Sequence, residues 1–176
     1  MDPVSPEKFS NLQVEVASLP RYEEAELSSL DRKYLLKLHI RTTISLLFFT
    51  AGLVAGYFFL QNNLNYFVGG FVLLLVLFGW SYYVNFQLMK RNGYALRQLD
   101  IIFRSGYLFE KTTVVPFNRV QHVSVERSFT DKLLKLSTLK IYTAGGAGSD
   151  ISIPGLLPQT ATSLKEEISV RIADHV

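Results

Sequence analysis

Residues 42–89, TTISLLFFTAGLVAGYFFLQNNLNYFVGGFVLLLVLFGWSYYVNFQLM, contain no Asp, Glu, Lys, Arg or His. Two apolar segments, residues 44–60 and 66–86, are separated by the polar sequence QNNLN. The hydrocarbon core of a bilayer is about 30 Å thick, and a helix needs about 20 apolar residues to cross it. The pattern therefore predicts a transmembrane helical hairpin. The alternative is a pair of buried helices in a soluble protein, although such helices rarely lack charge over this length.

Basic residues flank both ends of this hairpin, while the connecting loop carries no charge. They are Arg32, Lys33, Lys37 and Arg41 before the first span and Lys90 and Arg91 after the second. Basic residues close to span ends favour the cytoplasmic side of a membrane. We therefore expect a multi-pass protein of the inner (cytoplasmic) membrane, in contact with the lipid bilayer and with both termini in the cytoplasm.

The remaining composition excludes several classes of function. The formal net charge is +3, and it is almost balanced once the basic residues next to the spans are removed, so we expect no nucleic-acid partner. The absence of cysteine excludes a disulfide framework, a thiolate metal site and a cysteine nucleophile. The three histidines, His39, His122 and His175, are too scattered to suggest a metal site. We predict no catalytic, cofactor-binding or metal-binding residue.

The chain divides into three predicted parts: residues 1–38, 39–90 and 92–176. The first is an amino-terminal arm followed by an amphipathic segment, because apolar residues from 22 to 38 recur at helical spacing. Those residues are Leu27, Leu30, Tyr34 and Leu38. This segment is predicted to lie along the membrane surface as a helix or to continue directly into the first span, and a solvated helix face is the alternative.

Glycines occur at close spacing within the hairpin, which is the second part. Gly52 and Gly56 are four residues apart in the first span, and Gly69 and Gly70 lie at a comparable depth in the second. Small residues at this spacing let two helix backbones approach closely. The glycines are predicted to pack within the hairpin or against another subunit, and the two interpretations are compatible.

Beyond the second span the apolar periodicity changes from helical to alternating, which predicts strands. We expect them over residues 94–99, 101–109, 112–117, 119–127, 139–144 and 151–153. The pattern Ser128-x-x-Asp131 resembles a helix-capping start and predicts a single helical turn between strands. A one-sided apolar stripe predicts a closing helix after Pro158. The fold class is thus a transmembrane hairpin plus a mainly β, α+β domain with one carboxyl-terminal helix.

Two segments carry a family resemblance. They are KTTVVPFNRVQHVSVERS, residues 111–128, and TLKIYTAGGAGSDISIPGL, residues 138–156. Together with the two spans they resemble the bacterial membrane-flanked pleckstrin-homology-like (PH-like) domain family, YdbS-like branch, over roughly residue 34 to the end. The resemblance implies a bent seven-stranded PH-like barrel or sandwich with one open end capped by the final helix. It also suggests a partner, because YdbS-like proteins are similar to larger multi-span proteins with repeated copies of this domain.

Glycine-rich and basic segments invite two ligand-binding interpretations. Residues 145–148 are glycine-rich, but they lack the Gly-Lys-Ser/Thr ending of a phosphate loop and precede a strand, so a hairpin turn is the better interpretation. Phosphoinositide recognition needs several bases on one strand pair. The corresponding turn here, residues 97–100, has one base and one acid, and so departs from that pattern. His122 is either a hydrogen-bonded wall residue or part of a binding surface.

These observations leave two leading hypotheses. The first is a non-enzymatic membrane protein whose cytoplasmic domain assembles with itself, as a homo-oligomer, or in a hetero-complex with a related multi-span PH-like membrane protein. The candidate interaction surface is Arg119, Gln121, His122, Tyr142, Thr143, Gly145 and Gly146. The second is a lipid- or small-ligand-binding module at the membrane surface. An enzyme would need catalytic groups that this chain does not display.

Overall fold

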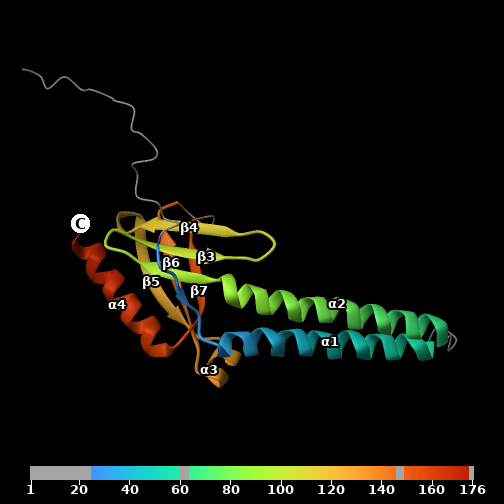
Figure 1. Cartoon of the computed structure of the whole chain (residues 1–176). Helices are drawn as coiled ribbons and strands as arrows, with labels where there is room; N and C mark the ends of the chain where they lie inside the picture. Colours follow the sequence, from blue (N-terminus) through green and yellow to red (C-terminus); the bar gives the residue numbers. More distant parts are fainter. Residues whose placement is uncertain (1–24, 60–63, 146–148, 175–176) are drawn as a thin grey trace, which may run out of the picture.

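A rod of two antiparallel helices projects from a sheet-rich body in the computed structural model, which describes residues 25–59, 64–145 and 149–174 (Figure 1). The rod consists of α1 (Lys33–Phe59) and α2 (Leu64–Arg91). Both helices are long and apolar enough to cross a membrane, and only 6% of the apolar window of α1 and 0% of that of α2 is buried. Within the described chain, then, neither helix is a buried core helix.

Polar contacts join the two helices where the rod meets the body. The amide Nδ2 of Asn85 donates a hydrogen bond to Thr42 Oγ1 at 2.9 Å, and both side chains are buried. Thr42 in turn donates to the carbonyl oxygen of Leu38 at 3.0 Å. The hydroxyls of Thr43 and Tyr82 lie 2.6 Å apart. Buried polar pairs of this kind fix the register of one helix against the other.

The segment before α1 differs from the predicted helix. Ser28–Ser29 forms a short strand, β1, that pairs antiparallel with β2, and Leu30 beside it is buried in the core of the body. The prediction of a helix from residue 22 is therefore wrong for the described residues 25–32, because Ser28 and Ser29 pair with β2 and Leu30 beside them enters the core. From Lys33 onward the helix continues directly into the long span, as one of the two expectations held. The predicted arm of residues 1–20 lies outside the described residues.

The body contains two antiparallel sheets. The first has the order β1-β2-β3-β4, where β2 is Gly93–Leu96, β3 is Asp100–Ser105 and β4 is Lys111–Pro116. The second has the order β5-β6-β7, where β5 is Val120–Glu126, β6 is Ser137–Thr143 and β7 is Ile151–Leu156. The short 3₁₀ helix η3 (Phe117–Arg119) connects β4 to β5.

The implied barrel is not closed in the described part of the chain, because β4 pairs only with β3 and β5 pairs only with β6. Pro116 ends β4, and the following 3₁₀ turn carries the chain away from the first sheet. Proline has no N–H to donate to a neighbouring strand, so it suits an edge position. The expectation of a barrel is corrected to two separate sheets, with an opening between β4 and the second sheet.

The core lies between the sheets and is covered by the carboxyl-terminal helix predicted from the sequence. Its fully buried side chains include Ile101, Phe117 and Leu139. The carboxyl-terminal helix α4 (Pro158–Asp174) contributes Ala161 and Ile168 to this core and packs against β5, β6 and η3. The short helix α3 (Phe129–Leu134) is capped as the sequence pattern predicts. In Figure 1, α3 lies beside the first turns of α1.

Gly155 of β7 packs against the start of α1. Its φ is +69°, and a Cβ placed there would lie 2.6 Å from the Cβ and Cγ of Tyr34. Its carbonyl oxygen also accepts a hydrogen bond from the Asp31 N–H at 2.9 Å.

We expect Gly155→Ala to lower the free energy of unfolding by about 2 kcal/mol, since it adds both a left-handed backbone conformation and a steric clash. Thermal denaturation of the full-length protein, followed by circular dichroism, measures this. Gly69→Ala is the matched control, because a Cβ at Gly69 meets no atom within 4 Å. Equal midpoints for the two variants would contradict the expectation.

Candidate functional site

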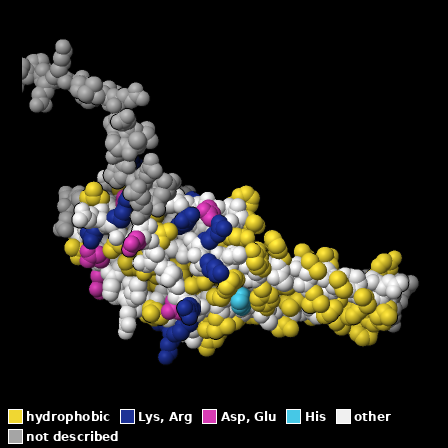
Figure 2. Space-filling view, viewed as in Figure 1, with side chains coloured by type: hydrophobic (Ala, Val, Ile, Leu, Met, Phe, Trp, Pro, Cys, Tyr) yellow, Lys and Arg dark blue, Asp and Glu magenta, His cyan; other side chains and the backbone are white. Residues whose placement is uncertain are grey.

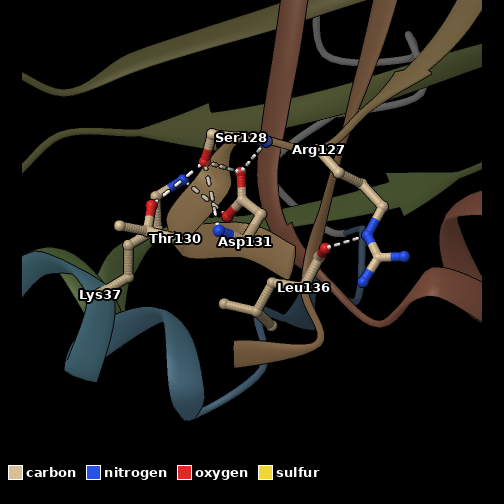
Figure 3. A network of polar contacts seen from close by, with 6 residues as sticks. All are labelled: Lys37, Arg127, Ser128, Thr130, Asp131 and Leu136. Atoms are coloured by element: carbon tan, nitrogen blue, oxygen red, sulfur yellow. Dashed lines mark hydrogen bonds and ion pairs between the residues drawn. The ribbon is translucent and has the colours of Figure 1, made fainter. Parts of the chain in front are cut away.

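A buried ion pair joins the first long helix to the body. Nζ of Lys37, on α1, lies 2.7 Å from Oδ1 of Asp131, on α3, and the Asp131 side chain is only 2% exposed. The other carboxylate oxygen accepts hydrogen bonds from the Ser128 hydroxyl at 2.6 Å and from the Ser128 N–H at 3.1 Å. Figure 3 shows Lys37 reaching the capped end of α3, next to Thr130. All three donors converge on one carboxylate.

The environment of Asp131 keeps it ionised. Burial alone would raise the pKa of this carboxyl, but the hydrogen bonds from Lys37 and Ser128 outweigh burial, and the pKa lies below its usual value. A buried carboxylate needs a neutralising partner, and here that partner links α1 to α3. Within the described residues, no group of three or more His, Cys, Asp or Glu side chains is arranged to hold a metal ion.

The turn between β3 and β4 forms a second junction, with α2. Asn92 Oδ1 accepts a hydrogen bond from the Gly106 N–H at 2.9 Å, and the hydroxyls of Tyr83 and Tyr107 lie 3.4 Å apart. Glu110 pairs with both Arg91 and Arg104. These pairs lower the pKa of Glu110. The turn is thus held against the base of α2.

The predicted interaction surface divides into two parts, the first of which lies on the outer face of the second sheet. His122 and Tyr142 are paired across β5 and β6, and their rings stack with centroids 4.1 Å apart and planes 15° apart. His122 is exposed, and Tyr142 is partly buried. Gln121 is also exposed and lies at a β-bulge between Val120 and His122.

The second part lies at the opening between the two sheets. Arg119, Thr143 and Gly145 line a pocket of about 270 Å³, together with β4 and Ser149. The hydroxyls of Thr143 and Ser149 are 2.6 Å apart, which ties the end of β6 to the start of the next segment. Thr143 is buried on the opposite side of β6 from Tyr142. Gly146 lies outside the described residues.

The four glycines of the hairpin differ in what surrounds them. A Cβ at Gly70 would meet Leu53 Cδ1 of the opposite helix at 2.8 Å, whereas a Cβ at Gly52, Gly56 or Gly69 would meet nothing within 4 Å. Gly70 therefore allows close packing inside the hairpin. The other three glycines lie on the open surface of the rod.

Sequence reasoning missed the contacts that join the rod to the body. The pattern of Ser128 and Asp131 signalled a helix cap, but nothing in it pointed to Lys37, which lies 94 residues away. Likewise, Tyr83 and Tyr107 were not predicted to meet. Two sequence features together could have suggested the first pair. One is the acidic residue of a helix-capping pattern, and the other is a basic residue at the start of an apolar span.

Comparison with known proteins adds a family. The model of the bacterial PH domain family matches residues 45–172, a range that includes most of both long helices and every strand from β2 to β7. The chain belongs to the bacterial PH domain family. The searches of curated proteins and of solved structures found no match. In this family member, the PH-like body carries the helical rod on the same side as α3 and the β3–β4 turn.

Replacing Lys37 tests the first junction. We expect Lys37→Met to lower the free energy of unfolding by about 2 kcal/mol, because Asp131 stays buried without its cation. Chemical denaturation of the full-length protein measures this. Lys165→Met, on the exposed side of α4, is the matched control and should leave stability unchanged. A junction that contributes nothing would give the same midpoint for both variants.

Acid should weaken the same junction. The pKa of Asp131 is lower in the folded protein than its usual value of 3.8. Its stabilising contribution is therefore complete above about pH 4 and is lost as pH falls through the folded pKa. Asp131→Asn should be less stable than the wild type at pH 7, and it should lose less stability between pH 5 and pH 2. Denaturation midpoints of the wild type and Asp131→Asn, measured across this pH range, test the assignment. An equal loss of stability in the two proteins would contradict it.

Proposed function

We propose that this chain is a non-enzymatic inner-membrane protein of the YdbS-like branch. Its cytoplasmic PH-like body would assemble with itself or with a related multi-span PH-like membrane protein. The observation that carries the proposal is an exposed apolar rod joined firmly to a PH-like body. An adaptor of this kind needs no catalytic group; it needs an anchor, a rigid connection and a surface for its partner.

The rod supports membrane anchoring through its size and surface. Helices of 27 and 28 residues are each about 40 Å long, which exceeds the roughly 30 Å of hydrocarbon that must be crossed. Figure 2 shows hydrophobic side chains along the rod and Lys and Arg side chains where the rod meets the body. An apolar surface of this extent on a soluble monomer would be unusual. The basic residues at the body end favour the cytoplasmic side for the body.

The outer face of the second sheet supports a protein-binding role. The stacked His122–Tyr142 pair offers a flat ring surface, and β5 and β7 are both edge strands within the described sheets. Aromatic surfaces and open strand edges are common docking sites for other proteins. Because anchoring confines two such bodies to one membrane, modest contacts between them suffice for assembly. Gly52 and Gly56 offer a second contact inside the membrane, where a helix of the partner can approach closely.

The alternative is a lipid- or small-ligand-binding module at the cytoplasmic membrane surface. Headgroup recognition at the β2–β3 turn, one form of this alternative, has less support. Arg97 is paired with Asp100 in a two-pronged contact, and Arg171 donates to the carbonyl oxygens of Arg97 and Gln98. The charge of Arg97 is already neutralised, and one guanidinium nitrogen of Arg171 is already bonded to two carbonyl groups. A phosphate cluster needs several uncommitted bases on one side. This turn is therefore a poor headgroup site.

Membrane insertion is tested first. We expect the full-length protein to sediment with membranes and to resist extraction at alkaline pH, and we expect reporters at both termini to signal the cytoplasm. Recovery of soluble protein without detergent, or reporters on opposite sides, would refute the anchor.

Assembly is tested with two differently tagged copies expressed together and purified in mild detergent. We expect co-purification of the second copy or of a larger PH-like membrane protein. The double variant His122→Ala/Tyr142→Ala should reduce this recovery by about tenfold, as loss of an aromatic interface centre does. Ser163→Ala, at an exposed position on α4 outside this surface, should have no effect. A monomer without any co-purifying membrane protein refutes the proposal.

A further inference from the structure

A pocket of about 370 Å³ lies along the first turns of α1, beside α3. It is lined by Tyr34, Lys37, Leu38, Ile40, Arg41, Ile44, Ser45 and Thr130. Arg41 is the last charged residue before the charge-free stretch begins at Thr42. The pocket therefore straddles the boundary between the polar body and the apolar rod.

The polar half of the pocket has one uncommitted cation. Lys37 is neutralised by Asp131, as described above. Arg41 is exposed, and no carboxylate of the described residues lies within ion-pair distance of it. It lies close enough to Tyr34 to act electrostatically on the phenol. Tyr34 and Thr130, which also line the pocket, each carry a hydroxyl, and that of Thr130 lies 3.1 Å from the Ser128 hydroxyl. An anion there would meet one full positive charge beside polar side chains.

The apolar half of the pocket continues onto the rod. Ile40 and Ile44 are four residues apart on α1, which places them one above the other on the same side of the helix. Ile44 is 60% exposed. On the neighbouring helix α3, Phe129 and Leu133 are also largely exposed. An occupant with an anionic head and an apolar tail would match both halves of this site.

We propose that this pocket binds an anionic phospholipid of the cytoplasmic leaflet, with its phosphate at Arg41 and an acyl chain along Ile40 and Ile44. The inference rests on the membrane anchoring of the proposed function. A guanidinium suits this role, since its planar donors can bond two phosphate oxygens at once. A free phosphate ion would use only the polar half, whereas a lipid also uses the apolar half. The site is separate from the β2–β3 turn and lies at the joint between rod and body.

The test uses the full-length protein in nanodiscs. The lipid is phosphatidylcholine alone or phosphatidylcholine with phosphatidylglycerol, and native mass spectrometry counts the lipids retained. We expect the wild type to retain phosphatidylglycerol selectively. Arg41→Gln should weaken this retention about tenfold, as loss of a charged hydrogen bond does. Arg32→Gln, which removes the same charge from an exposed residue just before α1, should retain the lipid as the wild type does.

Two further arms separate the alternatives. Thr130→Phe fills the pocket without changing charge, and should also abolish selective retention while circular dichroism confirms the fold. Inorganic phosphate added to the detergent-solubilised protein should give no thermal stabilisation.

Equal losses in Arg41→Gln and Arg32→Gln would indicate general attraction to an anionic surface and would overturn the proposal. Thermal stabilisation of the protein by inorganic phosphate would overturn it as well. So would selective retention of phosphatidylglycerol by Thr130→Phe. Failure of the protein to enter membranes would refute the anchor itself. Insertion without lipid selectivity refutes only the pocket.

Discussion

The ion pair between Lys37 and Asp131 is the contact on which the arrangement of rod and body depends. A carboxylate that is almost fully buried needs a partner, since an unpaired charge in that position would be costly. The partner comes from α1, one helical turn before the charge-free stretch, so the direction of the rod is coupled to the capping of α3. On the other side, Tyr83 of α2 contacts Tyr107 of the β3–β4 turn. Both helices of the rod are thus joined to the body by side-chain contacts.

The proposed functions depend on this joint. A body that is held rigidly presents a defined face to its neighbours in the membrane, and the His122–Tyr142 pair lies on the outer face of its second sheet. The same joint brings Arg41 and Thr130 to one pocket, although they come from helices that are distant in sequence. An occupant of this pocket would touch both α1 and α3. Lipid composition and the orientation of the body would thereby be coupled at a single site.

Much of the fold could be predicted because it follows from local patterns. Absence of charge over two long apolar segments indicated the rod, alternation indicated the strands, and Ser128 with Asp131 indicated α3. The strand at Ser28–Ser29 could not be found in this way, because it exists only by pairing with β2. The opening between the sheets depends on which strands pair, and alternation carries no information on that. Nor does any local pattern reveal that His122 stacks on Tyr142, since the ring contact needs the register of β5 on β6.

Residues Ser29 and Gly93 are neighbours in one sheet, yet the whole rod lies between them in the chain. The rod is in this sense an insertion between adjacent strands. Closing so large a loop has an entropic cost, which is smaller once the intervening segment is a compact hairpin. Completion of the first sheet should accordingly follow, and not precede, formation of the hairpin during biosynthesis. A chain whose helices fail to pair would leave the edge of β2 bare, and an uncovered edge is what invites aggregation and recognition by quality-control proteases.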